Sequence, residues 1–98
     1  NMLDAKEWLD VFPALDNTTR FNIMIYLSNE GPKSFMEVRT AFELQASSTQ
    51  HHLDKLMDAR LIVNSYRTPT GPTGPYSYYN LTERGKTILQ ILLTGNKP

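Results

Sequence analysis

The sequence of 98 residues contains no cysteine. This absence excludes disulfide bonds, thiolate metal ligands and cysteine nucleophiles, and it fits a reducing cytoplasm. No apolar run approaches the roughly 18 residues that a membrane-spanning helix needs, and the first residues do not resemble a signal peptide. We therefore expect a soluble, cytoplasmic protein without a membrane partner.

The sequence also has no excess of charge. Ten Lys and Arg residues are balanced by ten Asp and Glu residues, so the formal net charge is zero. A strongly basic domain would favour nucleic acid as the partner, but a net charge of zero gives no evidence for nucleic-acid binding. A local positive patch is still compatible with a neutral total, so both a DNA-binding protein and a protein-binding module stay open.

Patterns that carry catalysis or bind cofactors are missing too. The sequence offers no Ser-His-acid set, no paired carboxylates in an apolar setting and no glycine loop for phosphate, so we expect neither an enzyme nor a cofactor. His51 and His52 are adjacent, and neighbours on a helix diverge by roughly 100°, so they cannot chelate one metal ion together. We expect no metal site.

The hydrophobic content of 40% suits one domain with a core of its own. We place this domain at residues 2–94 and expect residues 95–98 to fray. A short amphipathic helix is predicted from Met2 to Phe12, ending at Pro13. A second helix, apolar on nearly every side, begins at Asn17 or Thr18 and ends at Gly31-Pro32, which makes it the central buried helix.

Two further helices are separated by only a tight turn. The first spans about Met36 to Phe42, and the second spans about Ala46 to Arg60. Helical periodicity divides the second helix into an apolar side and a polar side. The apolar side holds Thr49, Leu53, Leu56 and Met57, and the polar side holds Ser47, Ser48, His51, Asp54, Lys55 and Asp58. This pair predicts a helix-turn-helix in which the first helix supports the second, and the second presents its polar side to a partner.

Two strands are predicted after this pair, at Leu61 to Arg67 and at Tyr76 to Leu81. Between them, Thr68 to Pro75 contains prolines and glycines at most positions and reads as a long hairpin loop. The tyrosines of the hairpin are expected to pack, at least in part, into the core. A last helix follows a cap at Thr82.

The terminal helices carry more apolar residues than one core-facing stripe requires, so we expect a homodimer. The predicted interface consists of Leu3, Trp8, Phe12, Leu89, Leu92 and Leu93. A ligand-binding pocket between these helices is an alternative use of the same surface.

Three segments resemble the ArsR-like and MarR-like transcriptional regulators. They are LDNTTRFNIMIYL, STQHHLDKLMDARLI and YYNLTERGKTIL, and together they span Leu15 to Leu93. The resemblance implies a winged helix-turn-helix of α+β class, mostly α, with a two- to three-stranded antiparallel wing and flanking terminal helices. It further implies a homodimeric, sequence-specific regulator of transcription that binds double-stranded DNA, closest to the small stand-alone prokaryotic and archaeal members.

The sequence departs from the family pattern in three places. Arg60 stands where the family usually has the glycine that ends the recognition helix, so a non-glycine residue is expected in the left-handed region at a cost of about 1 kcal/mol. The wing has no Lys or Arg at its tip and keeps only Arg67 at its base. The clustered metal ligands of the metal-sensing members are absent, so the resemblance does not imply that this protein responds to a metal ion. A small-molecule effector stays unknown.

Predicted DNA contacts follow from how a helix-turn-helix docks, with the N-terminal turns of the second helix in the major groove. Ser47, Ser48, Gln50 and His51 are predicted to meet bases and phosphates there. Lys55 is predicted to reach a phosphate, and Arg67, Thr68 and Thr70 to follow the backbone or minor groove from the wing. The alternative is a winged-helix module that binds protein and no DNA.

Overall fold

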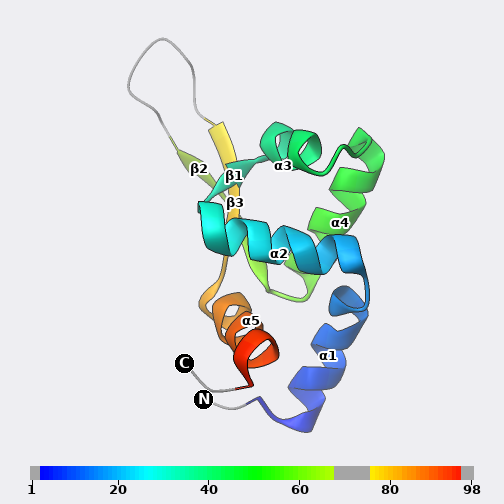
Figure 1. Cartoon of the computed structure of the whole chain (residues 1–98), viewed down its shortest axis with the longest axis vertical. Helices are drawn as coiled ribbons and strands as arrows, with labels where there is room; N and C mark the ends of the chain where they lie inside the picture. Colours follow the sequence, from blue (N-terminus) through cyan, green and yellow to red (C-terminus); the bar gives the residue numbers. More distant parts are fainter. Residues whose placement is uncertain (1–2, 68–75, 96–98) are drawn as a thin grey trace.

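The chain folds into five helices and a three-stranded sheet, as shown by a computed structural model that describes residues 3–67 and 76–95. The predicted class, mostly helical with an antiparallel sheet, is confirmed (Figure 1). In chain order the elements are α1 (Ala5–Leu15), α2 (Thr18–Glu30), β1 (Lys33–Ser34), α3 (Phe35–Ala41), α4 (Ala46–Asp58), β2 (Ile62–Arg67), β3 (Tyr76–Leu81) and α5 (Glu83–Thr94).

The sheet has the order β1-β3-β2, so the last strand in sequence is its centre. Both pairings are antiparallel. On one edge Lys33 lies opposite Tyr79, and on the other Ile62 lies opposite Leu81. The β2–β3 hairpin is the predicted wing, and the two-residue β1 ties it to the start of α3.

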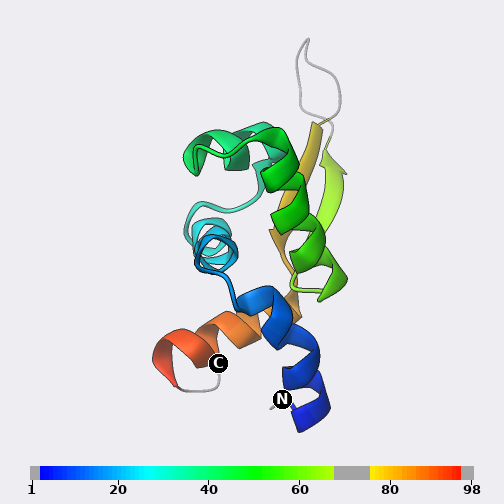
Figure 2. The same cartoon turned by 90° about the vertical axis from the view of Figure 1, so that its right-hand side faces the viewer.

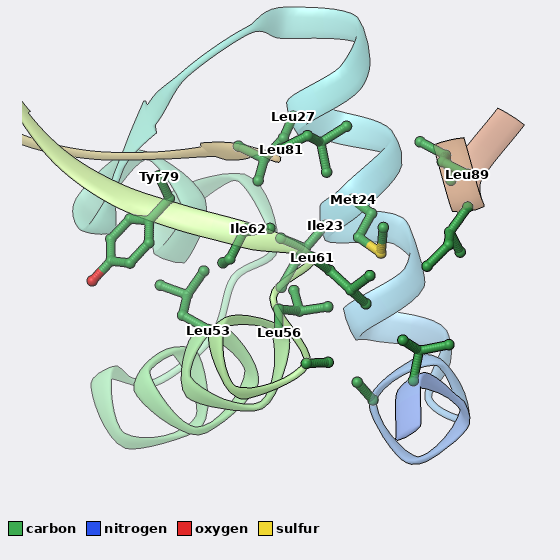
Figure 3. Packing of buried hydrophobic residues seen from close by; sticks show 14 of the residues in the cluster. Ile23, Met24, Leu27, Leu53, Leu56, Leu61, Ile62, Tyr79, Leu81 and Leu89 are labelled. Carbon is green, nitrogen blue, oxygen red and sulfur yellow. The ribbon is translucent and has the colours of Figure 1, made fainter. Parts of the chain in front are cut away.

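The core lies between α2, α4 and the sheet, and it confirms the predicted apolar side of α4. Thr49, Leu53 and Leu56 are fully buried, and Met57 packs against the cluster from its edge. Figure 3 shows Leu53 and Leu56 directed from α4 toward the strand that carries Ile62. The spacing of these residues therefore fixes which side of α4 is left for a partner.

Helix α1 does not end at Pro13, as the sequence predicted, but continues to Leu15 with Pro13 inside it. Proline has no N–H to donate to the carbonyl oxygen of Leu9, four residues earlier, and the carbonyl groups of the last turn of α1 are bonded from another helix. The guanidinium of Arg20 donates from Nη2 to the carbonyl oxygen of Pro13 (3.1 Å) and from Nε to that of Ala14 (2.7 Å). The last turn of α1 is thus stabilised by a side chain from α2.

Helices α3 and α4 both end in a residue of positive φ that is not glycine. Arg60 has φ of 59° after α4, as predicted, and Glu43, for which no such prediction was made, has φ of 51° after α3. In each case the following amide closes a Schellman motif, from Leu44 to Arg39 and from Leu61 to Leu56, both at 3.0 Å. This turn ends α4 at Asp58, two residues before the predicted limit at Arg60.

Helix α5 is attached to the end of α4 at close range. A Cβ atom on Gly85 would clash with the carbonyl oxygen of Leu61, so only glycine fits there. The Thr82 side chain caps α5, as predicted, and also donates to the carbonyl oxygen of Arg60 (2.7 Å). Among the described residues, no helix is long and apolar enough to cross a membrane.

Candidate nucleic-acid interface

The polar side of α4 is the exposed surface that its periodicity predicted. All six residues assigned to that side are exposed, and so is Gln50 at its border. The N-terminal end of α4 and the open end of the β2–β3 ladder both lie at the end of the molecule opposite α1 and α5 (Figures 1 and 2). The structure therefore brings together the α4 residues predicted to contact DNA, namely Ser47, Ser48, Gln50, His51 and Lys55.

The N-terminus of α4 has no side-chain cap. Within the described residues the other four helices begin with one, from Asp4, Asn17, Ser34 and Thr82. The residue at the corresponding position of α4 is Gln45, whose side chain makes no capping hydrogen bond. The first amide groups of α4 are consequently open to an acceptor from outside, and the helix dipole favours an anion there.

Charge is distributed unevenly along the outward side of α4. The first two turns carry no carboxylate, whereas Asp54, Lys55 and Asp58 follow further along. Gln50 joins the two regions, because its Nε2 donates to Oδ1 of Asp54 at 2.8 Å. The N-terminal half has no carboxylate, so it can approach an anionic polymer more closely than the C-terminal half can.

The hairpin provides a second surface beside α4. Tyr79 lies in the core, and burial, followed by the negative charge of Asp54, raises the pKa of its phenol. Tyr66 on β2 is 79% exposed, so the expectation that hairpin tyrosines pack holds for Tyr79 and not for Tyr66. Arg67 pairs with Tyr76 at the end of the ladder. The predicted contacts Thr68 and Thr70 lie outside the described residues.

A buried polar contact connects α4 to α2 and α1. The side chain of Arg20 is mostly buried, and its Nη1 lies 3.2 Å from Nδ1 of His52. A guanidinium can only donate, so Nδ1 of His52 accepts and the ring is neutral there. Burial lowers the pKa of His52 from its ordinary value of 6.5, and the neighbouring Arg20 and His51 lower it further. His52 thus lies at the edge of the core.

The terminal helices form an open apolar groove. Its volume is about 920 Å³, and it is lined by Leu9, Phe12, Pro13, Leu15, Asp16, Phe21 and Leu92. Two of the predicted dimer residues, Phe12 and Leu92, line this groove with exposures of 49% and 43%, and Leu93 is exposed close by in sequence. Leu3 and Trp8 are only partly buried.

The prediction that Leu89 belongs to a dimer interface is corrected by the structure. Leu89 is 3% exposed because its side of α5 faces the core of its own chain. Leu9, which the sequence did not single out, is 68% exposed and lines the groove instead. Apolar residues on both sides of a helix show that one side is not needed for the core of the chain, but only the packed structure shows which side this is.

Two functional candidates were missed by sequence reasoning. Arg20 was not singled out because its partners, Pro13, Ala14 and His52, lie on two other helices. Asp54 was predicted to lie on the polar side of α4 but not among the residues that contact DNA. Its spacing of four residues from Gln50 is the signal that predicts their contact on a helix.

A family of known proteins matches the part of the chain that contains α3 and α4. Residues 17–63, from the cap of α2 to the start of β2, match the family model of the bacterial regulatory proteins of the arsR family. No curated protein matches the chain. The matched segment contains the whole helix-turn-helix.

Solved structures share the fold over nearly the whole chain. The homodimeric winged helix-turn-helix DNA-binding domain of a possible ArsR-family transcriptional regulator from Mycobacterium bovis (fragment 1-100) is 20% identical, with a TM-score of 0.75 over 97% of this chain and 87% of that one. A transcriptional regulator homologue from Pyrococcus horikoshii OT3 is 19% identical, with a TM-score of 0.72 over 91% and 88%. Bacillus subtilis PadR, solved in complex with operator DNA, is 22% identical, with a TM-score of 0.63 over 84% of this chain and 50% of that one.

Proposed function

We propose that this chain, a winged helix-turn-helix whose residues 17–63 match the ArsR family of bacterial regulatory proteins, is a homodimeric, sequence-specific DNA-binding regulator of transcription. Helix α4 enters the major groove with its first two turns, and the hairpin follows the backbone or the minor groove. The fold neighbours include a homodimeric DNA-binding domain and a regulator bound to its operator, which supports this reading.

The observation that carries the proposal is the N-terminal half of α4. Its amides have no side-chain cap, and the side chains around them are exposed polar groups, namely Ser47, Ser48, Gln50 and His51. Free amides bind phosphate, and Gln and His bind base edges. Lys55 lies further along and can reach a phosphate through its longer side chain.

The apolar groove supports the homodimer. A chain that exposes Leu9, Phe12, Leu92 and Leu93 on its terminal helices leaves an apolar patch that a second copy can cover. In a two-fold dimer built this way, the two α4 helices would read half-sites about one helical turn apart in an inverted repeat.

The test is a binding titration on two duplexes, one selected from random sequences and one scrambled. Gln50→Ala and His51→Ala should each cost about 1–3 kcal/mol on the selected duplex and much less on the scrambled one. Gln90→Ala, which truncates an exposed glutamine on α5, is the matched control and should change neither affinity. Lys55→Ala should weaken binding to both duplexes and lower the salt slope by about one per protomer, and we expect the same of Arg67→Ala.

Equal losses on both duplexes for Gln50→Ala and His51→Ala would remove their base-reading role. If the folded wild-type protein bound no duplex even at low salt, the alternative of a protein-binding module would stand instead. The zero net charge and the acidic end of α4 are the features that favour that alternative.

A further inference from the structure

Gln50 and Asp54 form a hydrogen-bonded pair on the outward side of α4. Nε2 of Gln50 donates to Oδ1 of Asp54 at 2.8 Å, and both side chains are exposed. The spacing of four residues places the two side chains one above the other along the helix, with Asp54 further from its N-terminus. The contact therefore belongs to the same surface that is proposed to face DNA.

The Asp54 carboxylate fixes the orientation of the side-chain amide of Gln50. An ionised carboxylate only accepts, so the NH₂ group of Gln50 must face it and the carbonyl oxygen cannot. This leaves two groups on Gln50 for a partner, which are Oε1 as an acceptor and the second hydrogen on Nε2 as a donor. Without Asp54, the amide could rotate by half a turn and exchange these positions.

The remaining donor and acceptor match one base. In the major groove adenine presents N7 as an acceptor and the N6 amino group as a donor, whereas guanine presents two acceptors, N7 and O6. A glutamine that has given one N–H to Asp54 can satisfy both groups of adenine. It lacks the second donor that guanine would need, so one acceptor of guanine would be left unpaired.

From this geometry we propose that Asp54 is a positioning residue that sets base specificity, by holding Gln50 in the arrangement that selects adenine over guanine. The proposal rests on the proposed function, because it requires that Gln50 faces a base pair. It also accounts for a carboxylate on a surface that faces phosphate. Asp54 lowers the affinity for every duplex and raises the discrimination at one base pair.

Asp54 has a matched control on its own helix. Asp58 carries the same charge four residues further along the outward side, and within the described residues no hydrogen bond joins it to Gln50. Removing either carboxylate should raise the affinity for a scrambled duplex, since a repulsive charge is lost. Only Asp54→Ala should change the preference at the position that Gln50 reads.

The experiment measures the affinities of wild type, Asp54→Ala, Asp58→Ala, Gln50→Ala and the double variant of Gln50 and Asp54. Two duplexes are compared, the selected site and the same site with the adenine at the Gln50 position replaced by guanine. We expect Asp54→Ala to reduce the preference for adenine by about ten-fold and Asp58→Ala to leave it unchanged. In the Gln50→Ala background, Asp54→Ala should have no further effect on the preference.

A measurement without DNA tests the contact itself. The two side-chain N–H signals of Gln50, observed by NMR, should shift in Asp54→Ala and stay in place in Asp58→Ala, while thermal unfolding shows that both variants are folded. Unmoved Gln50 signals would overturn the contact. A preference that Asp54→Ala leaves intact, while wild type still binds its site, would overturn the specificity role alone. Loss of all duplex binding by wild type would overturn the proposed function, and this inference with it.

Discussion

Two residues have backbone conformations that glycine would adopt at a lower cost in free energy. Glu43 and Arg60 both follow a helix with positive φ, and both are exposed. For a residue with a Cβ atom the left-handed region costs roughly 1–2 kcal/mol. The chain tolerates this cost because the Schellman hydrogen bonds end the helices at the turn of the helix-turn-helix and at the start of the wing.

Arg60→Gly should therefore stabilise the protein. Relief of the strain exceeds the entropy that glycine adds to the unfolded chain, so we expect a gain of roughly 0.5–1 kcal/mol over Arg60→Ala. Urea unfolding of the three proteins measures the difference. Arg60→Ala is the control, because it removes the same side chain and keeps the strained φ. If Arg60→Gly proved less stable than Arg60→Ala, the positive φ at this position would be disproved.

Local periodicity predicted most helices and strands, and contacts between distant helices account for what it missed. The two sides of α4 and the cap at Thr82 follow from residues within a few positions of one another. Pro13 predicts the end of a helix locally, yet α1 continues to Leu15, and the carbonyl oxygens of its last turn accept from Arg20 on another helix. The contact between Arg20 and His52 has no local signal either.

The link between α2 and α4 predicts a pH dependence of stability. His52 accepts from Arg20 only when it is neutral, and its pKa in the folded protein lies below the ordinary 6.5. The unfolded chain therefore binds more protons between these two values, so stability rises with pH there. The contribution is fully present above about pH 6.5 and is lost as the pH falls toward the folded pKa.

Unfolding measured by urea between pH 8 and pH 5 tests this dependence. We expect the wild type to lose more stability on acidification than His52→Gln, whose side chain does not titrate. His51→Gln is the matched control, since it replaces the exposed neighbour and leaves the Arg20 contact in place. Parallel pH profiles for wild type and His52→Gln would refute the role assigned to His52.

The proposed homodimer places a second copy of the chain against the groove between the terminal helices. Sedimentation at micromolar concentration should give twice the chain mass of 11.2 kDa. Leu92→Glu places a charge in the groove and should shift the protein to monomers while leaving it folded, because Leu92 is 43% exposed within one chain. Met36→Glu is the control, since Met36 is exposed on α3, away from the groove.

A wild-type protein that sedimented as a monomer would refute this interface, and so would a dimer that Leu92→Glu leaves intact. The sequence could predict that some apolar surface of α5 lies outside the core, because with Leu92 and Leu93 the helix has more apolar residues than its core-facing side needs. It could not assign Leu89 to the core, since that depends on how α5 rotates about its close contact with Leu61.

The order of strands has a consequence for how the chain is made. The centre strand β3 is synthesised last, yet β1 and β2 both pair with it. While residues 76–81 are still inside the ribosome, β2 has no partner strand, and the apolar side of α4 with Leu53 and Leu56 has no sheet to cover it. A nascent chain halted before Tyr79 therefore leaves the part of α4 that the sheet covers open to water and to chaperones, and the core is completed only after β3 has left the ribosome.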